Sequence, residues 1–123
     1  MVESRKVFDV QRQGDTLIVV PQGETLGASE FGLEKEISGL HRLLSDPKVS
    51  HLVVDVGNAP YFGSMVIGTI MALCKKVCDQ GGQAVLCNAS QGMYDAIKTM
   101  KLDTVVPYYP TREEALRSLH PGE

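Results

Sequence analysis

The run HLVVDV at residues 51–56 restricts the fold of this chain more than any other stretch. It is almost continuously apolar, and half of its positions carry β-branched side chains. A strand that faces water on one side alternates polar and apolar residues, whereas a strand buried on both faces does not. Strands buried on both faces are typical of parallel sheets with helical crossovers, so this run predicts an α/β fold.

Strand-like and helix-like segments alternate through the rest of the chain. Residues 7–23 hold two apolar runs on either side of Gln13-Gly14-Asp15, which is typical of a β-hairpin. Helical spacing of apolar residues occurs at 28–46, 64–80, 90–100 and 111–119, and further strand-like runs occur at 83–88 and 103–109. The order β-β-α-β-α-β-α-β-α predicts a mixed, mostly parallel sheet of four or five strands with about four helices.

Three residues at the starts of predicted helices can act as caps. Ser90 suits the N-cap of the third helix, and Thr111 with Glu114 forms a capping box for the fourth. Ser64 follows a glycine-containing loop, so we expect it at the N-cap or in the first turn of the second helix. The residues that we expect in the core are Leu33, Ile37, Leu40, Val53, Val54, Val66, Ile70, Leu73, Val85 and Ile97, with Met93 and Met100 also facing inward.

Length and composition favour one domain over residues 1–123. The formal net charge of −3 argues against nucleic-acid binding, which needs a basic face. The N-terminus lacks the apolar segment of a signal peptide, and the longest apolar stretch, 65–74, is roughly half the length of a membrane span. We therefore expect a cytoplasmic protein with no membrane span.

The three cysteines favour a reducing compartment, since small secreted domains usually have a larger, even number. Cys74 and Cys78 lie four residues apart on one helix face, but no histidine is near them in the sequence to complete a zinc site. Free cysteines are often buried, so we expect these two and Cys87 to pack in the core. The sequence thus predicts no metal and no cofactor.

The sequence also predicts no catalytic residues. It contains none of the motifs that bind nucleotides through glycine-rich loops, and no nucleophile elbow. Asp55 lies within an apolar strand, where a buried carboxylate needs hydrogen-bond donors. We expect Asp55 to accept backbone N–H bonds at the end of that strand, because no histidine or lysine adjoins it as a catalytic partner.

The stretch LVVDVGNAPYFGSMVIGTI, at 52–70, resembles the core signature of STAS domains. This family includes bacterial anti-sigma-factor antagonists and the cytosolic tails of sulfate transporters. GETL at 23–26 and TREEAL at 111–116 also stand where the family has similar sequences. The resemblance implies a single STAS-like domain and places the family's phosphorylated serine at Ser64.

Five positions depart from the family pattern. Gly63, Met65 and Val66 replace the Asp, Ser and Gly that surround the phosphorylated serine, and Leu26 replaces an Asp in the loop after the second strand. In addition, Lys101 stands where the family often has a glycine before the last strand. In the family the acidic positions support kinase binding and phosphoryl transfer, so these departures bear on the switching cycle more than on the fold.

The function implied by the resemblance is that of a non-enzymatic regulatory module for transcription. It would bind an anti-sigma factor or related serine kinase and be switched by phosphorylation of Ser64. The predicted partner-binding residues are Glu24, Leu26, Phe62, Gly63, Ser64 and Met65, although burial in the core is a competing interpretation for Phe62 and Met65.

Two alternatives differ in class from this regulatory module. One is a phosphorylation-independent STAS scaffold or transport-complex subunit, and the other is an enzyme or small-molecule binder. The oligomeric state stays open, with a weak homodimer among the options.

Overall fold

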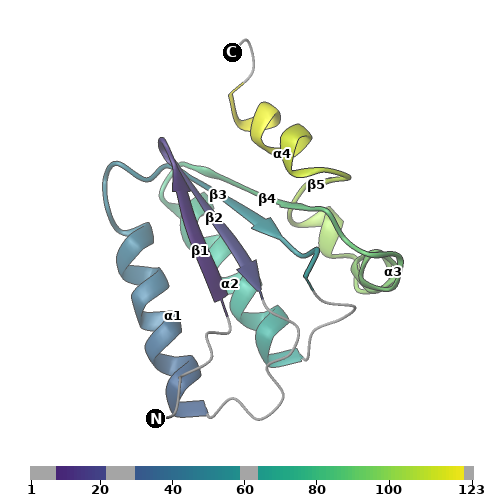
Figure 1. Ribbon diagram of the computed structural model, residues 1–123, viewed down its shortest axis with the longest axis horizontal. Coiled ribbons are helices and arrows are strands. Elements are labelled where there is room, and N and C mark those ends of the chain that lie inside the picture. The colour runs from purple at the N-terminus through teal and green to yellow at the C-terminus, as the bar shows by residue number, and fades with distance from the viewer. Residues whose placement is uncertain (1–7, 22–29, 59–63, 121–123) are drawn as a thin grey trace.

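The computed structural model describes residues 8–21, 30–58 and 64–120, apart from the side chains of 30–34 and 64–66. The described strands form one five-stranded sheet in the order β1-β2-β3-β4-β5, shown in Figure 1. They are β1 (Phe8–Gln13), β2 (Thr16–Pro21), β3 (His51–Asp55), β4 (Gln83–Cys87) and β5 (Tyr108–Tyr109). Only β1 and β2 are antiparallel, and each later pair is parallel. The predicted mixed, mostly parallel sheet is therefore confirmed.

The helices also follow the predicted order. They are α1 (Glu30–Leu44), α2 (Ser64–Asp79), α3 (Gln91–Thr99) and α4 (Arg112–Leu119), with a short 3-10 helix at Leu102–Thr104. Ser90 caps α3 by accepting a bond from the Met93 N–H at 3.3 Å. Thr111 caps α4 by accepting one from the Glu114 N–H at 3.1 Å, as the sequence predicts.

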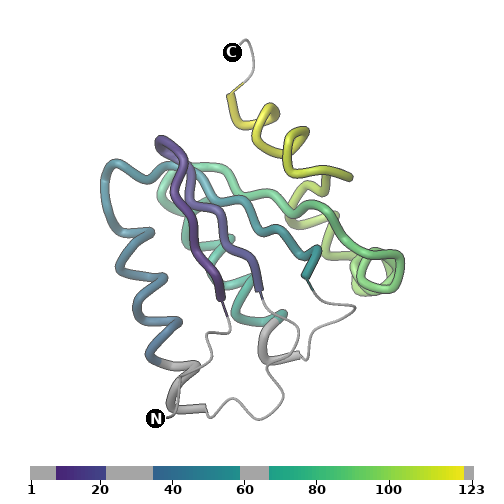
Figure 2. Tube along the Cα trace, viewed as in Figure 1, coloured from purple at the N-terminus to yellow at the C-terminus, as the bar shows by residue number. Residues whose placement is uncertain are grey.

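Helices cover both faces of the sheet, which explains why the central strands are apolar throughout. On one face, Leu52 and Val54 of β3 pack in a cluster with residues of α1, α2 and α3. On the other face, Val53 packs with Ala115 and Leu119 of α4. The separation of α4 from α1 and α2 can be followed along the chain in Figure 2. The sheet is thus the middle layer between two hydrophobic clusters.

Most of the predicted core residues are buried, and the exceptions are few. Leu40, Val53, Val54, Ile70, Leu73, Val85 and Ile97 are buried, as expected. Ile37 is only partly buried against the cluster. The side chains of Leu33 and Val66 lie outside the described residues. Since the buried residues come from α1, α2, α3, β3 and β4, the apolar patterns in the sequence identified the correct faces.

Two expectations about the C-terminal half are wrong. The strand predicted at 103–109 is confined to Tyr108–Tyr109, because the chain first forms the 3-10 helix at Leu102–Thr104. Met100 does not face inward: it follows the last residue of α3 as its C-cap and is 48% exposed. Both differences arise where the chain turns after α3, a region in which local geometry outweighs the apolar pattern.

The turn after α3 depends on a left-handed backbone at Lys101, whose φ is 58°. The Lys101 carbonyl accepts bonds from the Thr104 N–H and from Thr104 Oγ1, which hold the 3-10 helix in place. A residue that carries a Cβ is less stable than glycine by about 1 kcal/mol in this backbone conformation. The chain therefore carries strain at the position where the family often has glycine.

We expect Lys101→Gly to raise the free energy of unfolding by about 0.5 kcal/mol, because relief of the strain exceeds the added entropy of the unfolded chain. Chemical denaturation of both proteins measures the difference. Lys101→Ala is the matched control, since it removes the same charge and keeps the Cβ. If Lys101→Gly were no more stable than Lys101→Ala, relief of the strain at this position would not exceed the entropy cost of glycine.

Candidate functional site

The candidate site lies at the edge of the sheet where β3 and β4 end. These strands are parallel and in register, with Asp55 opposite Cys87, so the segments that follow them begin side by side. α2 begins at Ser64, which is thus a first-turn residue as the sequence predicts. The first N–H groups of a helix have no partner within the helix, and the helix dipole is positive there. The start of α2 therefore favours a negative group near Ser64.

Asp55 is a firmly anchored side chain at this edge, and it is only 4% exposed. One carboxylate oxygen, Oδ1, accepts the Gly57 N–H at 2.9 Å and the Asn88 side-chain amide at 3.1 Å. The other oxygen, Oδ2, accepts the Arg112 Nε–H at 2.9 Å. The predicted backbone bond is present, and the carboxylate also joins β3, the loop after β4 and the start of α4.

The backbone at Gly57 passes close to Asn88. A Cβ at Gly57 would lie 2.4 Å from the Asn88 amide nitrogen and 3.1 Å from the Asn88 carbonyl oxygen, so a larger residue here would displace the Asn88 amide from Asp55. Asn88 itself has a left-handed backbone with φ of 66°, which asparagine tolerates better than most residues. Asp55 and this close approach together fix the direction in which the chain leaves β3 toward Ser64.

The loop after β4 is held from its other side by Tyr108. The Tyr108 hydroxyl accepts the Ala89 N–H at 2.9 Å, and its ring packs against that of Tyr94 at 5.2 Å between centroids. Burial is the main cause that raises the pKa of Tyr108, so the phenol stays protonated at neutral pH. Its role at this edge is structural, because it orders the backbone next to Asn88.

The cysteines are free thiols, but they do not all pack in the core. Cys74 and Cys87 are buried, and burial raises the pKa of each to about 12, which makes both thiols unreactive. Cys78 is exposed, so the expectation that it is buried is wrong. It lies one turn further along α2 than Cys74, at the margin of the apolar helix face, since its neighbour Val77 is still buried in the cluster.

Most of the predicted partner-binding residues lie outside the described part of the structure. These residues are Glu24, Leu26, Phe62 and Gly63. Ser64 and Met65 are the first two residues of α2, and their side chains are not described. The structure thus fixes the backbone position of the predicted phosphorylation site but leaves the predicted surface around it untested.

Arg112 is a residue of this site that the sequence analysis missed. It follows the predicted cap Thr111 directly, 57 positions away from Asp55, so local sequence gave no reason to pair the two. The buried aspartate alone indicated that a donor was needed. Pairing of β3 with β4 and packing of α4 on the sheet supply that donor from a distant segment.

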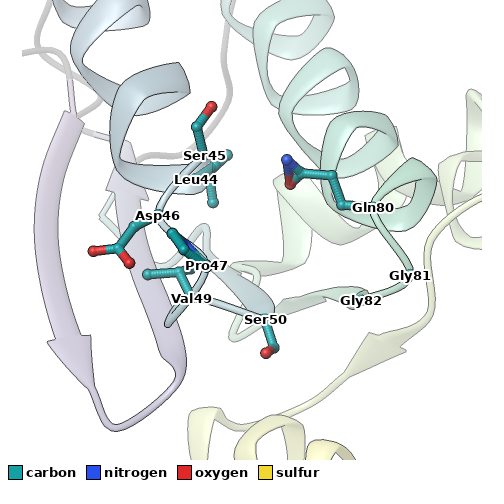
Figure 3. Close-up of a pocket in the computed structure, with 9 residues that line it drawn as sticks. All are labelled: Leu44, Ser45, Asp46, Pro47, Val49, Ser50, Gln80, Gly81 and Gly82. Carbon is teal, nitrogen blue, oxygen red and sulfur yellow. The ribbon is translucent and has the colours of Figure 1, made fainter.

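A polar cavity of about 200 Å³ lies at the opposite edge of the sheet, where β3 and β4 begin. Figure 3 shows its lining, which comes from the end of α1, the segment that leads into β3, and the turn between α2 and β4. Open parallel sheets bind ligands at the carboxyl ends of their strands. We therefore do not include this cavity in the candidate site.

The fold and this site define a small α/β domain in which α2 follows a strand that ends at an anchored, buried aspartate. A model of the STAS domain family matches residues 7–115, and the chain belongs to this family. None of the helices in the described ranges is both long and apolar enough to cross a membrane.

Solved structures with similar folds include several anti-sigma-factor antagonists. The STAS-domain antagonist from Planctomyces limnophilus has a TM-score of 0.74 at 20% identity, covering 91% of this chain and 97% of that one. The antagonist from Mycobacterium paratuberculosis has a TM-score of 0.72 at 20% identity, covering 91% and 92%. The phosphorylated form of the Bacillus cell fate determinant SpoIIAA has a TM-score of 0.69 at 16% identity, covering 92% and 99%. At these identities the likeness shows the shared fold.

Proposed function

We propose that this protein is a non-enzymatic regulatory module that binds an anti-sigma factor or related serine kinase and is switched by phosphorylation of Ser64. The observation that carries the proposal is the position of Ser64 as the first residue of α2, at the carboxyl edge of the sheet. Structurally similar proteins include anti-sigma-factor antagonists, one of them in a phosphorylated form. This likeness supports the class of partner that we propose.

A phosphate on Ser64 would stand at a favourable place in the fold. It would add about −1.5 to −2 charge next to the unpaired N–H groups at the start of α2. The helix dipole favours such a charge, so the phosphate need not disturb the packed core. The same charge would weaken binding of a partner that contacts an uncharged surface. Binding would then depend on the phosphorylation state of Ser64.

The polar groups at this edge support a binding role rather than a catalytic one. Both Asp55 oxygens accept bonds from fixed donors, and the carboxylate is nearly inaccessible to solvent. A general base must be within reach of a substrate proton, which this arrangement does not provide for Asp55. The Tyr108 hydroxyl is likewise engaged with backbone. We infer that these groups shape the surface and that the partner supplies any kinase activity.

The proposed location is the cytoplasm, where a sigma-factor regulator would act. The three free thiols support a reducing compartment, since none of them is paired in the structure. The net charge of −3 also supports a protein partner over nucleic acid.

Affinity purification of the tagged protein from its native cells, with and without ATP, tests the proposal. We expect a protein kinase of the anti-sigma class to co-purify, and mass spectrometry to find phosphate on Ser64 after incubation with ATP. The Ser64→Ala protein should capture the same partner and gain no phosphate. A stable complex that ATP leaves unchanged, with Ser64 unmodified, would contradict the switch and favour the scaffold or transport-complex alternative.

A further inference from the structure

A cluster of three side chains, Asp15, His51 and His120, lies at the end of the sheet where β3 begins. The candidate site with Ser64 is at the other end, where β3 and β4 finish. The three side chains come from the turn between β1 and β2, the first residue of β3, and the residue that follows α4. His120 Nε2 lies 2.8 Å from Asp15 Oδ1, and His51 Nε2 lies 3.9 Å from Asp15 Oδ2. The two imidazole rings meet edge to face, with 5.5 Å between their centroids. Both histidines therefore direct a ring nitrogen at the same carboxylate.

The backbone holds two members of this cluster firmly in place. The Asp15 carbonyl accepts the N–H groups of Ser50 and His51 at 2.8 and 3.1 Å. Thr16 is paired with His51 in the parallel ladder between β2 and β3. His120 is the C-cap of α4, and its N–H bonds to the Arg117 carbonyl. Packing of α4 on the sheet thus brings the third side chain to a site that the strands have already arranged.

We propose that Asp15, His51 and His120 bind a divalent transition-metal ion of the zinc class. Each offers one ligand atom, and the three atoms lie within 4.8 Å of one another. Two imidazole nitrogens and a carboxylate oxygen are a ligand set that suits zinc, with a fourth position left for water. The side chains are 18–41% exposed, so an ion can reach them from solvent.

The charges around the cluster are compatible with a cation. Arg12, near the end of β1, directs its guanidinium to the Gly14 carbonyl and to Asp46. Burial alone would raise the pKa of Asp15, but its bonds to His120 and Thr16 and the nearby histidine charges outweigh burial and lower it. The carboxylate is thus ionised, as a metal ligand must be.

In the protein without metal, the ring nitrogen of His51 that would bind the ion carries a proton. His51 Nδ1 accepts the Gln83 N–H at 3.2 Å, so a neutral His51 ring carries its proton on Nε2, the nitrogen that faces Asp15. Metal binding at Nε2 shifts this proton to Nδ1 and exchanges the bond from Gln83 for one to water. Gln83 is exposed, so water can replace that bond. Because this bond must be exchanged, we expect affinity in roughly the micromolar range.

Isothermal titration calorimetry tests the site. The reduced protein is first treated with EDTA to remove metal, and after removal of the EDTA it is titrated with zinc chloride. We expect one ion per chain, and at least about tenfold weaker binding in His120→Gln and in Asp15→Asn. The melting temperature should rise with zinc in the wild type, because the ion joins the end of α4 to the hairpin turn. In NMR spectra, the Gln83 amide should shift on zinc addition.

Two control variants separate this site from other zinc ligands. His41→Gln removes a histidine from α1, and Cys78→Ser removes the exposed thiol. Both should bind zinc as the wild type does. Equal affinity of wild type and both site variants, no binding at submillimolar zinc, or loss of binding in Cys78→Ser would overturn the proposal. Circular dichroism without zinc checks that each variant is folded.

Discussion

Ser64→Asp is expected to weaken binding of the partner by about 10- to 100-fold, while the free energy of unfolding changes by less than about 0.5 kcal/mol. The first part follows from placing a fixed negative charge in a contact surface, where an unpaired charge must lose its water. The second part follows from the position of Ser64 at the start of α2, where a negative side chain interacts favourably with the helix dipole. Binding titration with the captured partner and chemical denaturation measure the two effects.

Ser45→Asp is the control for this experiment. Ser45 is exposed and follows α1 at the opposite end of the sheet, so the variant adds the same charge away from the candidate site. We expect this protein to bind the partner as the wild type does. The switch hypothesis fails if Ser64→Asp binds as tightly as the wild type and no phosphate is found on Ser64 in cells. Ser64 would then act only in starting the helix.

Asp55→Ala should lower the free energy of unfolding by about 3 kcal/mol, the largest loss of stability that we expect from a side chain at this edge. The substitution leaves the Gly57 N–H, the Asn88 amide and the Arg112 guanidinium without their shared acceptor. Arg112 is about one-third exposed and can bind water instead, which limits its part of the loss. Chemical denaturation measures the change.

Asp79→Ala is the control for Asp55→Ala. Asp79 forms an ion pair with Lys75 at 2.8 Å, but both side chains are mostly exposed, so its loss should change stability by less than about 0.5 kcal/mol. A double-mutant cycle with Arg112→Met isolates the coupling between Asp55 and Arg112. If Asp55→Ala were no more damaging than Asp79→Ala, the buried network would have no role in holding this edge together.

The strand and helix order could be derived from the sequence because it depends on local patterns. The unbroken apolar run of β3 required cover on both faces, and α4 on one face with α1 and α2 on the other provides it. Ser90 and Thr111 were recognisable as caps because a cap acts on an N–H only three residues away. The start of α2 at Ser64 was predictable for the same reason, since a loop ends and an apolar helical pattern begins there.

The errors of sequence reasoning concern apolar residues at the ends or margins of helix faces. Met100 is exposed because α3 ends beside it, whereas Cys78 is exposed at the margin of a face whose residue Val77 is still buried. The short β5 has a related cause, since the left-handed Lys101 turns the chain into a 3-10 helix before the strand can form. Periodicity describes which face of a helix is apolar, but it does not fix where the contact with the sheet stops.

The sequence by itself determined the fold class, the order of the elements and the location of Ser64 at the head of a helix. Only the tertiary structure joined Asp55 to Arg112, and Asp15 to His51 and His120. These groups are distant in sequence, and Asp15 and His120 are 105 positions apart. The physical reason is that parallel pairing and the docking of α4 bring remote chain segments to one place, and no local preference of the backbone encodes which side chains then meet.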